Sequence, residues 1–448
     1  MISLPAQLPQ RCWLAHAQVP AALGELDAAD ESLSAAGAMP QQANPGTVAL
    51  LLDGGRVAAV AAVPAGDAPV IDLQGATVLP AFVDPHTHLD KGDLLATGMA
   101  PERDLFRAIA AVRADREHWN ADELALRIGF ALRSAYAHGT RALLSYCDWM
   151  LPQPAWQVLL ALRESWRGRI EIVPASLSSV DLLVDVAQAE QLGRALAAAR
   201  GVLGIFVYPA PHVPALIPLA FDLAERFDLA LDFHVDEHLA PLHANLPTIA
   251  RLARERGLGA RTVCGHACLL GALPAAERDA TLDLVAAAGC SLVSLPWTNL
   301  HLQDSSIAPP HATPRQRGLL PVHEAAARGI PVAFGSDNHR DPFFPAGDLD
   351  PLQTLALAAL VAQLDDPLAG WSHAITTTPA RLLGLDWDGV LRAGSPADLV
   401  IHPGRNAAEV LSRSTVGRVV LRAGQPIDST LPDFRELDGL RRPTFAKS

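Results

Sequence analysis

Two histidines, His86 and His88, stand one residue apart in the segment VDPHTHLDKG, directly after the apolar run ATVLPAFV. In an extended strand, residues i and i+2 point to the same side, so both imidazoles can contact one ion. A His-X-His pair alone is weak evidence, because a structural pair of histidines at the end of a buried strand explains it equally well. The pair therefore needs partners elsewhere in the chain before it indicates a metal site.

Further polar residues stand at the ends of three later apolar segments. His234 and Glu237 lie three residues apart in DFHVDEH, His266 lies in CGHAC, and Asp337 lies in FGSDN. Ionisable side chains are costly to bury singly, and here they recur in similar apolar surroundings. Three histidines and one carboxylate suit a divalent ion such as Zn²⁺ or Fe²⁺ and leave a coordination position for water. The recurrence favours one shared metal site over four unrelated buried polar groups.

The segments that must position these side chains alternate between two kinds. Short apolar runs rich in β-branched residues are followed by helix-like stretches rich in Ala, Leu, Arg and Glu. Continuous apolar runs are typical of a parallel sheet covered by helices. We expect eight strands, at 81–88, 140–148, 170–177, 202–209, 229–237, 261–268, 291–299 and 331–338.

Eight such units predict an α/β fold with a closed (β/α)8 TIM-type barrel, whose active site lies at the carboxyl ends of the strands. An open doubly wound sheet is the alternative, and it is disfavoured because no G-x-G-x-x-G follows the first strand. The chain ends differ: TVALLLDGGRVAAVAAV predicts a hairpin, and GSPADLVIH and GRVVLRAGQPI predict short strands. We therefore expect residues 81–388 to form the barrel, and residues 1–80 and 389–448 to form one small β-sandwich-like domain.

The composition argues against several classes of protein. The 448 residues carry a formal net charge of −13, whereas nucleic-acid phosphates call for clustered Lys and Arg. No apolar run reaches the about 18 residues of a transmembrane helix, and the N-terminus lacks a signal-peptide pattern. The five cysteines show no disulfide spacing, which favours a reducing compartment. We expect a cytoplasmic protein that acts on a small molecule, binds neither nucleic acid nor membrane, and is compatible with a homo-oligomer.

The sequence resembles the amidohydrolase superfamily, and within it the cytosine deaminase-like branch of metal-dependent hydrolases. The resemblance covers nearly the whole chain and rests on PAFVDPHTHLDK, DFHVDE, GHAC, LPWTNLHLQ, FGSDNHRDPFFPAGDLDPLQ and AGSPADLVI. It implies one divalent metal ion, Zn or Fe, with Mn also compatible. The implied ligands of this ion are His86, His88, His234 and Asp337.

The chemistry that the resemblance implies is hydrolysis of a C–N bond other than a peptide bond. Hydroxide generated at the ion attacks an sp² carbon, and Asp337 takes the proton of the water. Glu237 donates a proton to a ring or leaving nitrogen, and His266 stabilises the charge on the tetrahedral centre. We expect a deaminase of a small nitrogen heterocycle such as a pyrimidine, purine or triazine. The alternative is an amidohydrolase cleaving a cyclic or small acyclic amide; a non-catalytic binding protein is disfavoured because ligands and Glu237 are all present.

The positions that would read the substrate depart from the cytosine deaminases. Leu177 or Ser178 stands where those enzymes place a glutamine, Asn338 replaces a second aspartate, and Tyr146 replaces a histidine. The substrate is therefore expected not to be cytosine. The candidate substrate-binding residues are Lys91, Ser178, Asn299, Asn338 and Phe343.

Two of these candidates have an alternative interpretation. Lys91 either meets an anionic substrate or is a solvated loop lysine, and Phe343 packs either on the substrate ring or in a loop core. The sequence also leaves open whether His339 and Arg340 face the site.

Overall fold

The computed structural model describes residues 4–24, 46–149, 154–240, 242–305, 312–316 and 318–442. The chain divides into two compact units. The first unit comprises Met1–Val83, Ala135–Arg141 and Asp350–Leu431, and the second comprises Asp84–Ser134, Ala142–Leu349 and Pro432–Ser448. The division predicted from composition, at residues 80 and 388, stays a prediction, and parts of its first and last segments lie outside the described residues.

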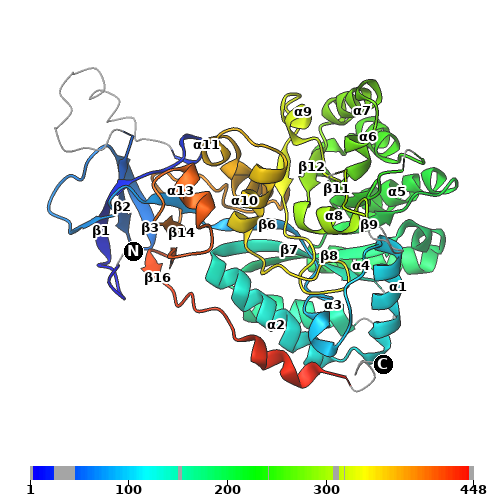
Figure 1. Cartoon of the computed structure of the whole chain (residues 1–448), viewed down its shortest axis with the longest axis horizontal. Coiled ribbons are helices and arrows are strands. Elements are labelled where there is room, and N and C mark those ends of the chain that lie inside the picture. Colours follow the sequence, from blue (N-terminus) through cyan, green and yellow to red (C-terminus); the bar gives the residue numbers. More distant parts are fainter. Residues whose placement is uncertain are drawn as a thin grey trace. The chain divides into compact units, whose positions relative to one another are not determined.

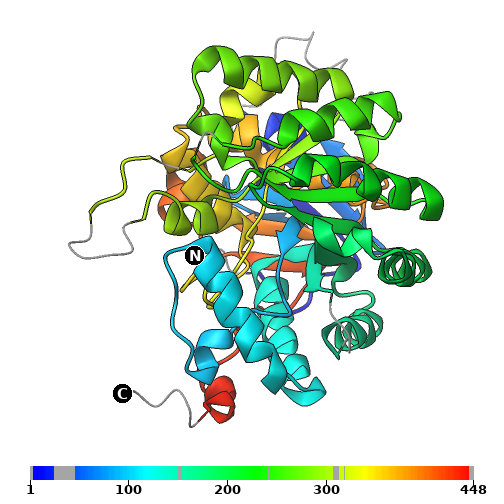
Figure 2. The same cartoon turned by 90° about the vertical axis from the view of Figure 1, so that its right-hand side faces the viewer.

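Eight parallel strands form the central sheet of the second unit (Figures 1 and 2). In their order in the sheet they are β6 (Phe82–Thr87), β7 (Thr140–Asp148), β8 (Glu171–Ser179), β9 (Leu203–Val207), β10 (Leu231–Val235), β11 (Thr262–His266), β12 (Ser291–Ser294) and β13 (Val332–Phe334). Every strand that the apolar runs predict is present. An isolated parallel bridge between Thr87 and Asp337 joins the first strand to the last, and the Asp337 N–H donates to the His86 carbonyl over 2.8 Å. The predicted barrel is thus confirmed.

Continuous burial explains why these runs become parallel strands. All five residues of β10 are buried, as expected for a strand covered on both faces. The covering helices follow their strands along the chain and lie around the outside of the sheet (Figure 2). They include α3 (Pro154–Ser165), α4 (Val186–Ala199), α5 (Ile217–Phe227), α6 (Leu246–Glu255), α7 (Ala275–Ala288) and α9 (Val322–Ala326).

The connection between β6 and β7 is longer than the others and holds two helices, α1 (Leu105–Asp115) and α2 (Ala121–His138). Helix α1 begins at Asp104, whose side chain accepts a hydrogen bond from the Arg107 N–H. A βα loop of this length at the carboxyl end of a barrel strand is where function usually lies.

One predicted strand is in part a helix. The segment 291–299 was expected to be extended throughout, but β12 ends at Ser294 and helix α8 (Pro296–Leu302) follows. Proline at the first helical position carries no N–H that would be left unpaired, and its ring fixes a helical φ. Asn299 and His301 therefore lie on a helix and do not continue strand seven.

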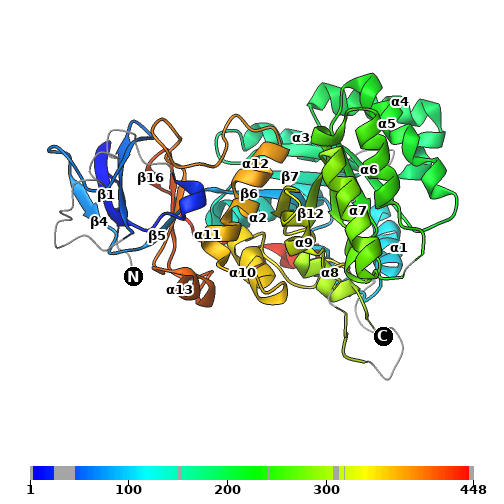
Figure 3. The same ribbon diagram turned by 90° about the horizontal axis from the view of Figure 1, so that it is seen from above.

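The first unit contains two four-stranded sheets (Figure 3). One has the order β3 (Arg56–Ala61), β2 (Val48–Asp53), β1 (Arg11–Ala17) and β4 (Val70–Asp72). The other has the order β16 (Gln425–Pro426), β15 (Val419–Arg422), β14 (Leu399–His402) and β5 (Thr77–Pro80). Residues of both sheets, among them Leu14, Leu50, Val78 and Leu399, share one apolar core. Strands from the two chain ends thus form a small β-sandwich-like structure, as predicted.

The remaining helices of the first unit are α10 (Pro351–Val361), α11 (Pro367–Trp371), α12 (Thr377–Leu382) and α13 (Ala407–Ser412). Within the described residues, every helix is too short or too polar to be a membrane span.

Candidate active site

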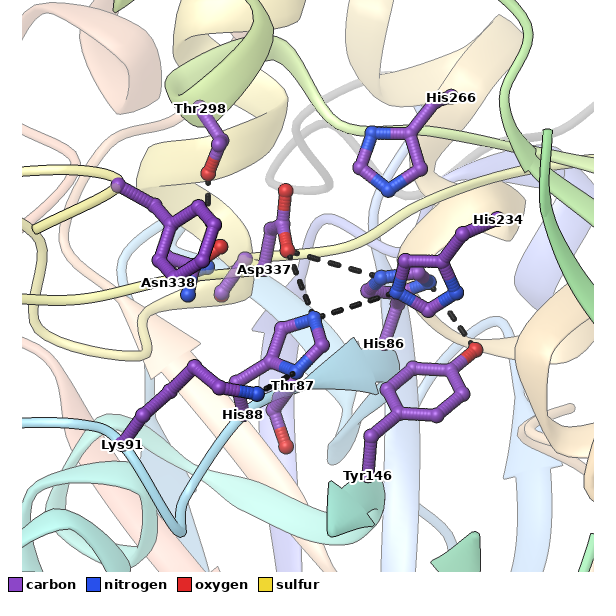
Figure 4. Close-up of polar contacts among 12 residues, drawn as sticks. His86, Thr87, His88, Lys91, Tyr146, His234, His266, Thr298, Asp337 and Asn338 are labelled. Atoms are coloured by element: carbon purple, nitrogen blue, oxygen red, sulfur yellow. Dashed lines mark hydrogen bonds and ion pairs between the residues drawn. The ribbon is translucent and has the colours of Figure 1, made fainter. Parts of the chain in front are cut away.

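The two histidines of the His-X-His pair, His86 on β6 and His88 just after it, point into the carboxyl end of the barrel (Figure 4). Both are buried. His88 Nε2 lies 3.2 Å from Asp337 Oδ1, and His86 Nε2 lies 3.6 Å from the same oxygen. The barrel-closing hydrogen bond from Asp337 to His86 therefore also brings the carboxylate beside the pair.

His234 completes the cluster from the end of β10. Its Nε2 lies 3.3 Å from His88 Nε2, and its ring centroid lies 4.5 Å from that of His86. Two imidazole nitrogens that face each other this closely must share a proton or a cation, because their lone pairs repel. The four residues predicted to bind the ion are thus brought together.

The donor set fits a divalent metal ion. Burial lowers the pKa of His86, His88 and His234 well below the ordinary value, so each ring is neutral and keeps a lone pair for a ligand bond. Within the described part of the chain, His86 Nε2 and both carboxylate oxygens of Asp337 are buried without a hydrogen-bond partner. Such atoms are costly unless they are satisfied, and one cation bound by nitrogen and oxygen ligands would satisfy all three.

The backbone is strained at two residues of the site, Asp337 and His266. Asp337 has φ +63° and His266 has φ +67°, in the left-handed region that non-glycine residues enter at a cost of about 1–3 kcal/mol. Each residue stands at or just after a strand end, where the turn directs the side chain inward. Local strain of this kind persists where surrounding packing imposes it, and it is common at functional sites.

Glu237 and His266 lie next to the cluster, just beyond β10 and at the end of β11. Glu237 Oε1 lies 3.3 Å from His266 Nδ1, and Asn299 Nδ2 lies 3.0 Å from the same nitrogen. Burial, with a smaller contribution from the Asp337 charge, raises the pKa of Glu237 well above its usual range. Burial lowers the pKa of His266 to about 4. Both shifts favour the uncharged forms, a carboxylic acid beside a neutral imidazole, and this arrangement is suited to proton donation.

A cavity of about 590 Å³ opens onto these groups, a volume typical of small-molecule sites. Its floor includes His88, His234, Glu237, His266 and Asp337. Its walls are largely apolar and aromatic, with contributions from Leu105, Ile109, Trp149, Phe206 and Phe343.

Four of the five predicted substrate-binding residues line this cavity: Lys91, Ser178, Asn338 and Phe343. Lys91 is 2 % exposed, so it is not a solvated loop lysine. Its Nζ donates to Asp148 Oδ1 over 2.9 Å and lies 3.3 Å from His88 Nδ1. Asn299, the fifth, is buried on α8, and its amide contacts His266.

His339 and Arg340 are directed elsewhere. Arg340 Nε donates to Asp93 Oδ1 over 2.6 Å, and His339 Nε2 lies 3.6 Å from Asp93 Oδ2. Neither contributes to the cavity lining in the described part of the chain.

Sequence reasoning missed the part of the cavity that α1 and the end of β7 provide. Arg113 and Arg116 line the cavity from α1 and the residue after it, and Arg116 pairs with Asp148. Trp149, just after β7, lines it as well. No motif marks these residues, and the one available signal was the unusual length of the connection between the first two barrel strands.

Comparisons with known proteins agree with this geometry. The sequence model of the amidohydrolase family matches residues 69–167 and 178–428. A pterin deaminase from Rhizobium rhizogenes (strain K84) is 40% identical over 382 residues, covering 84% of this chain and 87% of that protein. The chain therefore belongs to the amidohydrolase family, and it is a hydrolase of carbon–nitrogen bonds other than peptide bonds.

Two solved structures share the fold. A 5-methylcytosine deaminase from Klebsiella pneumoniae liganded with 5-fluorocytosine has a TM-score of 0.77 at 24% identity, covering 94% of this chain and 98% of that one. An N-isopropylammelide isopropylaminohydrolase from Burkholderia multivorans has a TM-score of 0.73 at 24% identity, covering 94% of this chain and 100% of that one. At this level of identity the likeness concerns the fold alone.

Proposed function

We propose that this protein is a metal-dependent deaminase of a pterin, replacing the exocyclic amino group of the ring by oxygen and releasing ammonia. The observation that carries the proposal is the 40% identity to a pterin deaminase over 84% of the chain. The buried cluster of three histidines and an aspartate at the floor of a 590 Å³ cavity supports it.

The ion would be held by His86, His88, His234 and Asp337. When bound, a divalent ion lowers the pKa of a water molecule and supplies a nucleophile near neutral pH. We propose zinc or iron for this role, with manganese also compatible, because nitrogen and oxygen ligands accept all three.

The side chains of this protein would carry the proton transfers. A free oxygen of Asp337 accepts a proton from the attacking water. Glu237, held as a carboxylic acid by burial, donates a proton to the ring nitrogen beside the attacked carbon or to the leaving amine. His266, neutral and buried, lies where it can stabilise charge that develops on the carbon's substituents.

Residues of the cavity walls would position the substrate. Trp149, Phe206 and Phe343 offer aromatic surface to a flat heteroaromatic ring. Lys91, Ser178 and Asn338 supply polar groups that can hydrogen-bond to ring nitrogens and the carbonyl, which fixes the orientation of the ring.

Ammonia release from a panel of amino-heterocycles tests the proposal. The purified protein, loaded in turn with zinc, iron and manganese, is assayed with pterin, guanine, cytosine and an aminotriazine. We expect ammonia from pterin in amounts equal to the pterin consumed, with a slower reaction on the other rings. Turnover of another ring without reaction on pterin would contradict the substrate, and a carboxylate product without ammonia would instead indicate amide hydrolysis.

Two further expectations belong to the same proposal, a cytoplasmic location and self-association. Light scattering coupled to size-exclusion chromatography tests the second, since a homo-oligomer elutes with a multiple of the 47.4 kDa chain mass.

A further inference from the structure

Tyr146 lies against the candidate metal ligands without lining the cavity (Figure 4). It is fully buried on β7. Its ring centroid lies 4.5 Å from that of His86, 4.6 Å from that of His234 and 5.1 Å from that of His88, on which it stacks. Its hydroxyl lies 3.2 Å from His86 Nδ1. A residue that contacts three ligands but not the cavity can act on the ion only through those ligands.

The carboxyl group of Asp232 lies beside the same hydroxyl and interacts with it. Asp232 is buried on β10, two residues before His234, so both side chains point to the same side of the sheet. Asp232, Tyr146 and His86 thus form a continuous chain of polar contacts that ends at a proposed metal ligand.

The direction of this chain follows from the two nitrogens of His86. Nε2 lies 3.6 Å from Asp337 Oδ1, on the side of the other proposed ligands, so it is the nitrogen that would bind the ion and must carry no proton. A neutral ring has one N–H, which is then on Nδ1, and the Tyr146 oxygen 3.2 Å away accepts from it. The one proton of the hydroxyl is left to donate to Asp232.

The surroundings of His86 Nε2 agree with this order. The atom lies 3.6 Å from Asp337 Oδ1, beyond hydrogen-bond distance, and no described residue hydrogen-bonds to it. The reverse order, with Tyr146 donating to Nδ1, would place a proton on Nε2 and block it as a ligand.

We propose that Asp232 and Tyr146 form a hydrogen-bond relay that holds His86 in its Nδ1-protonated tautomer and presents Nε2 as a ligand to the metal ion. Tyr146 is thereby a positioning residue. Partners of this kind orient ligand histidines in metal sites generally, and here the acceptor is reached through a tyrosine. The inference rests on the metal site of the proposed function and does not depend on the pterin substrate.

Replacement of the hydroxyl tests the relay. Tyr146→Phe keeps the ring packing and removes the only acceptor proposed for the Nδ1–H of His86. We expect the affinity of the metal-free protein for Zn²⁺, measured by competition with a chromophoric chelator, to fall by about 10–100-fold.

Tyr208→Phe is the matched control. The Tyr208 hydroxyl contacts Asp181 at 3.1 Å and His212 at 3.0 Å at the exposed rim of the cavity, so removing it should leave Zn²⁺ affinity unchanged. An equal loss of affinity in this control would overturn the relay, because the effect would then not depend on contact with His86.

Asp232→Asn is the second variant, and it decides the question if Tyr146→Phe does not fold. It keeps the hydroxyl but offers a neutral acceptor, which binds a donor about half as strongly as a carboxylate, so we expect a smaller loss in the same direction.

Nitrogen NMR of the metal-free protein gives an independent readout: His86 should be predominantly protonated on Nδ1, and less so in Tyr146→Phe. Unchanged affinity in the folded variants, or an Nε2-protonated His86, overturns the relay alone. A wild-type protein that binds no metal overturns the proposed function as well.

Discussion

Burial sets the charge state of the side chains that face the cavity. It favours the protonated form of Glu237 and the neutral form of His266, because a charge on either would have to be desolvated. The same effect keeps His86, His88 and His234 neutral and able to bind a cation. Burial thus favours the neutral forms of Glu237 and of the histidines beside it.

Glu237→Gln should separate proton transfer from metal binding. Glutamine preserves the shape of the side chain but cannot donate an acidic proton. We expect turnover to fall by about 10²–10⁴-fold, while Zn²⁺ affinity stays within the wild-type range because Glu237 is not among the proposed ligands. Steady-state ammonia release and chelator competition measure the two effects, and full turnover in the variant would exclude Glu237 as the acid.

The raised pKa of Glu237 also predicts how activity depends on pH. Since the acid form of Glu237 is the proton donor, activity requires a pH below the raised pKa and is lost as the pH rises through it. The alkaline limb of the kcat/KM profile should therefore be flattened in Glu237→Gln. An identical alkaline limb in the variant would assign that limb to another group.

Two glycines leave space for His86, the first of the proposed ligands. A Cβ atom at Gly335, after β13, would lie 2.9 Å from the His86 Cβ and 3.2 Å from the His86 carbonyl oxygen. A Cβ atom at Gly265 on β11 would lie 3.1 Å from the His86 ring. Gly265 and Gly335 thus have no side chain where His86 must fit.

Gly335→Ala should accordingly disturb the site. The added methyl meets atoms on or close to the backbone of β6, so strands must shift, at a cost of about 1–3 kcal/mol, and Zn²⁺ binding should weaken. Gly129→Ala on α2 is the control: nothing lies within 4 Å of its added Cβ, and alanine favours a helix. Denaturant unfolding of both variants checks this, and equal stability of Gly335→Ala and wild type would show that β6 accommodates the methyl.

A buried ion pair secures the start of α10 in the first unit. Asp350 is fully surrounded and pairs with Arg418, whose Nη1 donates to Oδ1 over 2.9 Å, and it also accepts from the Leu352 N–H at the helix terminus. Burial acts to raise the pKa of Asp350, but the charges of Arg418 and His138 and the hydrogen bond from Arg418 outweigh it, so the pKa lies below the usual value.

Removal of this carboxylate should destabilise the fold. Asp350→Ala leaves Arg418 buried and unpaired, and we expect a loss of about 3–5 kcal/mol in the free energy of unfolding. Because the folded pKa is depressed, the contribution is present above the unfolded pKa and is lost as the pH falls through the folded pKa, so wild type and variant should converge in acid. Arg11→Ala, which breaks an exposed pair with Asp53, should cost about 0–1 kcal/mol.

At the scale of the molecule, the proposed ligands come from three strands that are distant in sequence. His86 lies on β6, His88 just after it, His234 on β10 and Asp337 just after β13. An ion bound to all four would tie the first strand of the barrel to the last and to the strand opposite. Metal binding should therefore stabilise the whole barrel as well as enable catalysis.

Chelation tests this coupling. Removal of metal should abolish ammonia release and lower the Tm, and zinc at one hundred times its Kd should restore about 2.7 kcal/mol of stability. Calorimetry with and without metal measures the shift. Glu237→Gln, which keeps the ligands, should show the same shift, and a Tm independent of zinc would contradict a metal site in the barrel.

The sequence by itself determined the eight barrel strands and the candidate ligands. Short continuous apolar runs that alternate with helical segments favour covered parallel strands. Polar residues at the ends of such strands are expected at the shared mouth of a barrel. The run 291–299 shows where this reasoning fails, because an apolar stretch does not reveal that Pro296 begins a helix.

Only the tertiary structure decided which side chains around the ligands face the cavity. Lys91 is held inside by Asp148, Asn299 is turned to His266, Arg116 enters from an inserted helix, and Tyr146 lies behind the ligands. The physical reason is common to all four. Burial and hydrogen bonding depend on partners contributed by distant segments of the chain, and these partners are set only when the barrel closes.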